Sequence, residues 1–227
     1  MSEISGGWLV PPAPPRETLS GRYARLEPLD GAAHAASLHS AMHNHDDLWR
    51  YMAYGPFGAE ADFQKFLSGA AASGDPLYFA VVDAQTRQAL GWLSIMSIRP
   101  DMGVAEIGSI VLSPALQKSR TATEAFFLVI DALFEAGYRR VEWKCDARNR
   151  ASRKAAQRLG FRFEGLFLQH MVVKGENRDT AWFALLDHEW EKQRLAFKGW
   201  LEPANFDADA QQLRPLVSFE APPTLGG

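Results

Sequence analysis

The residues best suited to chemistry in this chain lie between positions 104 and 161. Residues 117–122 read Gln-Lys-Ser-Arg-Thr-Ala and stand at the start of a strong helical pattern over residues 121–136. The first turn of a helix carries unsatisfied N–H groups and a partial positive charge, which suit an anion. Lys118 and Arg120 add cations beside them. This combination predicts a phosphate-binding site at the start of the helix.

Three further polar residues of this region are candidates for a site. Glu106 falls in a predicted strand over residues 104–112, where a carboxylate is either an exposed side chain or a base that acts through water. Asn149 and Ser152 stand three residues apart, shortly after another predicted strand over residues 140–145. Their side chains offer hydrogen-bonding groups.

A cluster of acidic and aromatic residues follows the first predicted helix. Asp46 and Asp47 stand close to Trp49, Tyr51 and Tyr54. Carboxylates and aromatic rings together suit a cationic amine. A packed aromatic loop explains the same residues equally well, because aromatic side chains dominate protein cores.

Neither the histidines nor the cysteine indicates a metal site. His39, His43 and His45 are close in sequence, but the Glu that zinc-protease motifs place beside the first His is missing. Cys145 is the single cysteine, and a lone cysteine is most often a small buried hydrophobic residue. We therefore predict that the protein uses no metal.

The composition excludes several classes of protein. The chain has 227 residues, with 24 Lys and Arg against 27 Asp and Glu. Its pI near 6.1 argues against a nucleic-acid binder. One cysteine cannot form an internal disulfide, which fits a reducing compartment. The first residues do not resemble a secretory signal, and no apolar run approaches the roughly 20 residues that cross a bilayer. These features predict a cytoplasmic protein with no membrane partner.

The elements that position the candidate residues alternate along the chain. Apolar residues at helical spacing predict helices, and β-type runs predict strands. The predicted helices are residues 33–42, 60–72, 121–136 and 149 or 152 to 159. The predicted strands are residues 21–29, 77–82, 90–98, 104–112, 140–145, 163–173 and 179–186. This order indicates an α+β fold with a mixed sheet of about seven strands, flanked by helices.

The two ends of the chain differ from its middle. Residues 1–20 are rich in proline and predict an extended segment. Residues 21–187 read as one domain, and residues 188–227 as a C-terminal helix and tail. Trp8, Trp190 and Trp200 near the ends indicate a surface for a partner, which allows a homodimer.

The motif order in residues 104–161 resembles that of the GCN5-related N-acetyltransferase (GNAT) superfamily. Within it, the sequence is similar to the RimJ/RimL-like branch of ribosomal-protein N-terminal acetyltransferases. The resemblance spans roughly residues 21–187 and is more specific than any one motif. It rests on four features: Glu106-Ile107-Gly108 in a strand, Leu112-Ser113-Pro114 leading to Gln117, Asn149 with Ser152, and Leu159-Gly160-Phe161 at the end of a helix.

The resemblance implies a fold, a reaction and a set of site residues. It implies a mostly antiparallel central sheet, acetyl-CoA as co-substrate, and direct attack on it by a primary amine of a small molecule or a protein N-terminus. It assigns coenzyme contacts to Val111, Leu112, Gln117, Lys118, Ser119, Arg120, Thr121, Ala122, Thr123, Asn149 and Ser152. It assigns the acceptor wall to the segment that carries Asp46, Trp49, Tyr51 and Tyr54. Glu106 is the best candidate for a base that acts through water. Ser152 or water protonates the leaving thiolate, or the thiolate leaves unaided.

Two positions depart from the family pattern. Arg120 stands where a glycine is usual, and a glycine lets the backbone come close to the phosphate. The arginine either compensates with its charge or weakens coenzyme binding. We expect retained binding, because the other parts of the module are present. Ala156 stands where many relatives carry a tyrosine acid. These departures leave a second hypothesis open, namely a non-catalytic acyl-CoA-binding or regulatory module of the same fold.

Overall fold

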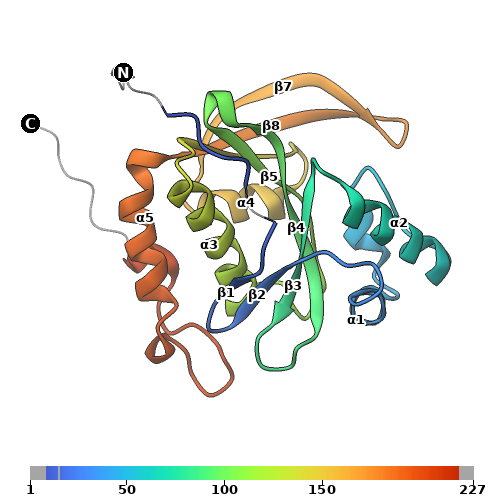
Figure 1. The fold of residues 1–227 in the computed structure, drawn as a ribbon, viewed down its shortest axis with the longest axis horizontal. Helices are drawn as coiled ribbons and strands as arrows, with labels where there is room; N and C mark the ends of the chain where they lie inside the picture. The colour runs from blue at the N-terminus through green and yellow to red at the C-terminus, as the bar shows by residue number, and fades with distance from the viewer. Residues whose placement is uncertain (1–8, 15, 220–227) are drawn as a thin grey trace, which may run out of the picture.

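The computed structural model describes residues 9–14 and 16–219, and it contains an eight-stranded sheet in the order β1-β2-β3-β4-β5-β6-β8-β7 (Figure 1). Among the described strands, only β5 and β6 pair in parallel. The strands are β1 (Leu19–Ser20), β2 (Ala24–Pro28), β3 (Leu77–Asp83), β4 (Ala89–Arg99), β5 (Val104–Leu112), β6 (Arg140–Asp146), β7 (Arg162–Val173) and β8 (Glu176–Leu186). The predicted α+β class and mostly antiparallel sheet are confirmed. The extra strand is β1, whose two residues are too few to show an alternating pattern.

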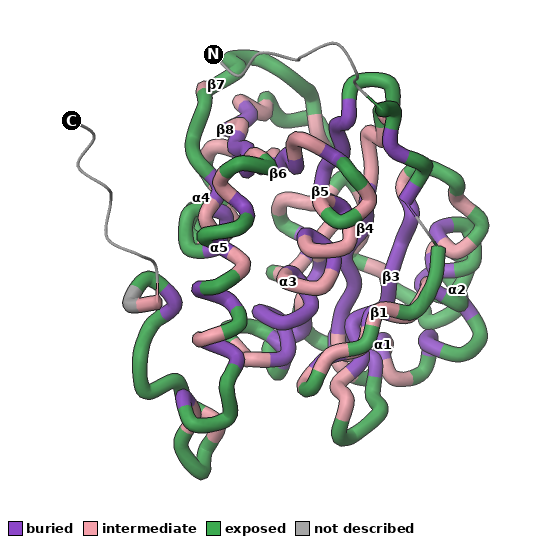
Figure 2. The backbone as a smooth tube through the Cα atoms, turned by 60° about the vertical axis from the view of Figure 1, so that its left-hand side comes forward, coloured by how far each residue is buried: buried purple, intermediate pink, exposed green. Residues whose placement is uncertain are grey.

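Helices cover both faces of this sheet. They are α1 (Ala35–Met42), α2 (Glu60–Ala72), α3 (Arg120–Glu135), α4 (Arg150–Arg158) and α5 (Asp187–Trp200). Successive strand residues point to opposite faces, so neighbours in β3 join different cores. Phe79 and Val81 pack in the core with α3 and α5, whereas Ala80 and Val82 pack with α1 and α2. The outer strand β7 is largely exposed, as Figure 2 shows.

Helix α3 begins and ends where local chemistry requires it. The Ser119 hydroxyl accepts a hydrogen bond from the Ala122 N–H at 3.0 Å and caps the first turn. Phe126, Val129 and Ile130 lie along its buried face. Gly137 follows the helix with a φ of +94°, a left-handed conformation that glycine adopts without steric cost. The helix therefore presents its N-terminus at a fixed position beside the end of β5.

The C-terminal part of the chain packs against the same core. Trp190 and Trp200 of α5 are 5% and 2% exposed, and Leu216 is buried with them. The prediction that these tryptophans form a partner surface is therefore wrong, because their rings are used inside the molecule. Trp8 lies outside the described residues. Within the part of the chain that the structure describes, no helix is long and apolar enough to span a membrane.

Candidate active site

The sheet opens between β5 and β6. The two strands pair only at their beginnings, where Val104–Glu106 meets Arg140–Glu142. Beyond Glu106 they diverge, so the backbone groups of β5 that face β6 are left without a strand partner. The pairing of β5 with β4 is also interrupted, by a bulge at which Ser109 has a φ of +50°. Val111 and Leu112 lie at the open end of the strand, where β5 and β6 are no longer paired.

The loop before α3 lies at the open end of this cleft. Two of its side chains fix the loop to the ends of neighbouring strands. Gln117 donates from Nε2 to the Leu112 carbonyl at 3.0 Å, and Thr121 donates from Oγ1 to Asp83 at 3.1 Å. Within the described residues, the N–H groups of Lys118, Arg120 and Thr121 donate to no protein acceptor. Free N–H groups at a helix start suit an anion. The loop thus offers backbone donors to an anion.

Arg120 is directed to other partners. Its guanidinium carbon lies 4.4 Å from the centroid of the Tyr23 ring and 5.5 Å from that of Phe206. This stacking joins the start of α3 to segments near both ends of the chain. Lys118, by contrast, is exposed and has a φ of +58°. Lys118 is therefore the freer of the two cations to meet a phosphate.

On the other side of the cleft, Asn149 and Ser152 begin α4. The Asn149 Oδ1 accepts a hydrogen bond from the Ser152 N–H at 3.0 Å, and the Ser152 hydroxyl accepts one from the Trp143 Nε1 at 3.0 Å. Burial raises the pKa of the nearby Cys145 thiol, which keeps it protonated. Ala156 is fully buried. The hydrogen bonds at the start of α4 use the Asn149 side-chain oxygen and an acceptor site of the Ser152 hydroxyl, so the remaining donors are the Asn149 amide hydrogens and the Ser152 hydroxyl proton.

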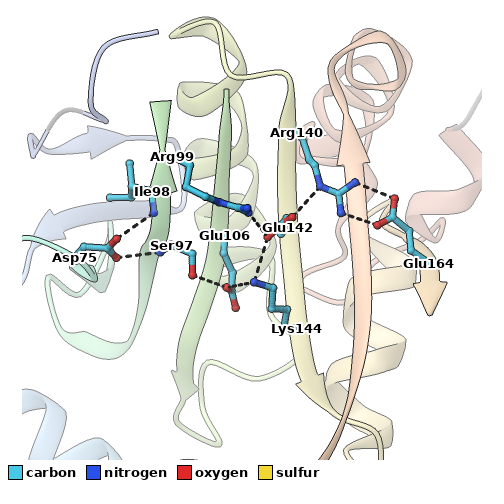
Figure 3. Close-up of polar contacts among 9 residues, drawn as sticks. All are labelled: Asp75, Ser97, Ile98, Arg99, Glu106, Arg140, Glu142, Lys144 and Glu164. Carbon is cyan, nitrogen blue, oxygen red and sulfur yellow. Dashed lines mark hydrogen bonds and ion pairs between the residues drawn. The ribbon is translucent and has the colours of Figure 1, made fainter. Parts of the chain in front are cut away.

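Glu106 lies in a network of charges on the sheet (Figure 3). Its carboxylate is 2.9 Å from the Lys144 Nζ and accepts a hydrogen bond from the Ser97 hydroxyl at 3.0 Å. Lys144 also lies 3.2 Å from Glu142, which in turn meets Arg140 at 2.9 Å. Burial by itself would raise the pKa of Glu142, but hydrogen bonds from Arg140 and the charge of Lys144 outweigh it and lower the pKa.

Sequence reasoning missed Lys144 and Glu142 as site residues. Both are in the predicted strand 140–145, at alternate positions that share one face of a strand. Glu142 is only 5% exposed and is the register partner of Glu106 in the parallel pair. The alternation was visible in the sequence, but the pairing with Glu106 was not, because register between distant strands is set by the fold.

The predicted acceptor residues fall into different environments. The Tyr54 hydroxyl is 2.8 Å from the Ser109 hydroxyl on the bulge of β5, and burial raises the pKa of Tyr54, which keeps the phenol protonated. The Tyr51 hydroxyl donates to the Arg148 carbonyl at 3.3 Å. Asp46 is exposed in a short 3₁₀ turn, Asp46–Trp49. Trp49 is only 4% exposed and packs among other aromatic rings, so it is a core residue.

A hollow of about 180 Å³ adjoins the end of β6. It lies between the segment after α1, the β6 end and the β7–β8 hairpin, and the Lys174 Nζ donates to the Trp49 carbonyl at 2.8 Å across it. Its lining residues are Arg50, Tyr51, Asp146, Arg148, Val173, Lys174, Glu176 and Arg178. Among the described residues, no group of three or more His, Cys, Asp or Glu could hold a metal ion.

Comparisons with known proteins agree with this geometry. Residues 24–162 match the acetyltransferase (GNAT) domain family. A GCN5-related N-acetyltransferase from Brucella melitensis is 44% identical, with a TM-score of 0.92 over 94% of this chain and 98% of that one. A GNAT-family protein from Chromobacterium violaceum is 41% identical, with a TM-score of 0.79 over 84% of this chain and 96% of that one. No curated protein matches the chain.

More distant structures share the fold alone. One is an acetyltransferase from Salmonella typhimurium that modifies the N-terminal serine of ribosomal protein L7/L12. It is 22% identical, with a TM-score of 0.65 over 75% of this chain and 99% of that one. The family match and the 44% identity are much stronger, and they favour catalysis over a non-catalytic module. The chain belongs to the GNAT family and is an acetyl-CoA-dependent N-acetyltransferase.

Proposed function

We propose that the protein acetylates a primary amine of a small molecule or a protein N-terminus, by direct attack in a ternary complex. The observation that carries the proposal is the cleft between β5 and β6, flanked by free N–H groups at the start of α3. We further propose that residues 21–187 form the catalytic domain, between the extended segment 1–20 and the C-terminal part 188–227.

The coenzyme is held by residues of the cleft wall. The N–H groups of Lys118, Arg120 and Thr121 receive the pyrophosphate, and the Lys118 ammonium adds charge. Val111 and Leu112 offer backbone groups to the pantetheine amides, and Asn149 adds its side-chain amide from the opposite side. The side chains of Gln117, Ser119 and Thr121 keep the loop in shape through their own hydrogen bonds.

The transfer itself exchanges one bond for another. The amine nitrogen forms a bond to the acetyl carbon while the bond from that carbon to the coenzyme sulfur breaks. Glu106 takes the proton of the amine through a water molecule, because its carboxylate is held in place by Lys144 and Ser97. The Ser152 hydroxyl accepts from Trp143 and still has a proton to donate to the thiolate. Solvent restores that proton.

The acceptor approaches from the side of Tyr51 and Tyr54, with Asp46 at the exposed rim. We include a protein N-terminus among the acceptors because of the resemblance to the RimJ/RimL-like branch. The likeness to the Salmonella typhimurium enzyme is one of fold, so the test must cover both acceptor classes.

The test combines turnover with binding. Release of free coenzyme A is followed with a panel of small amines and of peptides with free N-termini, and acetyl-CoA is titrated by calorimetry. We expect micromolar coenzyme binding and turnover of at least one acceptor class. Binding without turnover on the whole panel would favour the non-catalytic module, and no coenzyme binding would overturn both readings.

A further inference from the structure

The hollow beside the end of β6 is lined by more positive than negative charge. Four cationic side chains, Arg50, Arg148, Lys174 and Arg178, line it together with two carboxylates, Asp146 and Glu176. Burial by itself would raise the pKa of Asp146, but hydrogen bonds from Arg148 outweigh it and lower the pKa, so the carboxylate is charged. The lining thus carries two more positive charges than negative ones.

Arg148 forms ion pairs with both carboxylates, and the charge of Arg178 also acts on Asp146. Its Nη2 lies 3.0 Å from Asp146 and its Nη1 lies 3.2 Å from Glu176. Lys174 donates to the Trp49 carbonyl. Within the described residues, Arg50 and Arg178 have no carboxylate within ion-pair distance. The surplus positive charge of the hollow is therefore carried by Lys174, whose ammonium is hydrogen-bonded to a carbonyl, and by Arg50 and Arg178.

The two arginines are held in different ways. The Arg178 Nε is buried and has no hydrogen-bond partner among the described residues, so part of this guanidinium has lost water without gaining an acceptor. The Arg50 guanidinium lies 5.5 Å from the centroid of the Tyr51 ring. A desolvated guanidinium gains more from an anion than an exposed one does, and it binds a carboxylate through two parallel hydrogen bonds.

The hollow adjoins the cleft on the acceptor side. Asp146 ends β6, which forms one wall of the cleft, and Tyr51 bonds to the Arg148 carbonyl. Tyr54, three residues after Tyr51, reaches Ser109 on the opposite wall. The coenzyme phosphates are assigned to different elements, at the start of α3. The positive charge of the hollow therefore faces the acceptor.

We propose that Arg50 and Arg178 form a subsite for a carboxylate that the acceptor carries near its amine. This inference rests on the proposed function and names its substrate class: amino acids, or peptides with an acidic residue next to the N-terminus. Positive charge close to the amine also favours its neutral, nucleophilic form. The subsite thus selects an acceptor and helps to prepare it for attack.

Matched acceptors test the subsite. One arm compares L-phenylalanine with L-phenylalaninamide, and the other compares peptide amides that begin Ser-Asp with those that begin Ser-Asn. We expect kcat/KM to be at least tenfold higher for the acid in one arm, and that arm identifies the source of the carboxylate. R178Q and R50Q should each lower kcat/KM for the acid about tenfold more than for its neutral match. R178K, which keeps the charge, should retain most of the preference if R178Q does not fold.

Lys192→Gln is the matched control, because it removes one positive charge from an exposed position on α5. It should leave the preference unchanged. Turnover of acids and neutral matches at equal kcat/KM in both arms would overturn the subsite and leave the proposed function standing. No turnover of any amine, despite coenzyme binding, would overturn the proposed function and with it the subsite.

Discussion

The ammonium of Lys144 joins the carboxylates of Glu106 and Glu142, at 2.9 Å and 3.2 Å. It also lies 4.0 Å from the centroid of the Trp182 ring. Glu106 and Glu142 are register partners at the last paired position before β5 and β6 separate (Figure 3). The ion pair therefore fixes the proposed base at the closed end of the cleft, where the two strands begin to separate.

Replacing Glu106 with glutamine should lower kcat about 100-fold, because an amide cannot accept the proton of the amine. The KM for acetyl-CoA should stay within about twofold, since Glu106 is not assigned to coenzyme binding. Steady-state kinetics and circular dichroism check rate and folding together. Glu164→Gln, at the exposed end of the same network, is the control and should keep the kcat of the unmodified enzyme. An E106Q enzyme with full kcat would exclude Glu106 as the base.

Glu142 should make the free energy of unfolding depend on pH in the acidic range. Its pKa in the folded protein is lower than the ordinary value of 4.5. The unfolded chain then binds more protons, so this contribution is present above about pH 4.5 and is lost as pH falls through the lowered pKa. Urea unfolding at pH 3 to 6 should show a flatter pH dependence for Glu142→Gln. Glu60→Gln, at an exposed position on α2, should keep the slope of the unmodified protein.

Asn149 has a structural role as the N-cap of α4 and a proposed role in coenzyme binding. Asn149→Ala should raise the KM for acetyl-CoA several-fold and also destabilise the protein by about 1 kcal/mol through loss of the cap. Asn149→Ser keeps a capping oxygen, so it should recover stability but not the KM. If Asn149→Ser recovers the KM as well, the residue acts only as a cap.

The two cations of the α3 loop should behave differently. Lys118→Ala should raise the KM for acetyl-CoA about fivefold, because it removes a free charge near the phosphate site. Arg120→Ala should change this KM less than twofold and instead cost about 1 kcal/mol of stability, because its guanidinium stacks on Tyr23 and Phe206. Kinetics and urea unfolding of both variants separate these effects. A larger KM change for Arg120→Ala would reverse the assignment.

Glu124 should hold the start of β2 against α3. Its buried carboxylate accepts hydrogen bonds from the backbone N–H groups of Arg22, Tyr23 and Ala24. Glu124→Gln should lower the free energy of unfolding by about 2 kcal/mol, because charge-assisted hydrogen bonds are lost.

Gly21→Ala tests the same contact from the other side, since a Cβ at Gly21 would lie 2.4 Å from the Glu124 Cδ. It should also be destabilising. Gly58→Ala, where a Cβ meets no atom within 4 Å, is the control and should change stability little. If Glu124→Gln and Gly21→Ala were both as stable as Gly58→Ala and the unmodified protein, the contact would contribute nothing to stability.

The sequence by itself determined the elements and the family. Periodicity located α2 at Glu60–Ala72 and β5 at Val104–Leu112. These patterns are local, because the periodicity of a helix face or of an alternating strand depends only on residues close in sequence. The motifs around Gln117 and Asn149 were readable for the same reason, since a capped helix start depends on a few consecutive residues.

Only the tertiary structure decided which distant residues meet. The sequence could not separate a packed Trp49 from an acceptor wall, because aromatic residues serve both purposes. The sequence predicted Arg120 as a cation for the phosphate site, but it did not reveal the stacking of Arg120 on Phe206, 86 positions away. The Glu106–Lys144 pair and the placement of Arg50 and Arg178 beside one hollow depend on strand register and loop packing. Such contacts are set by the whole fold, which no short segment encodes.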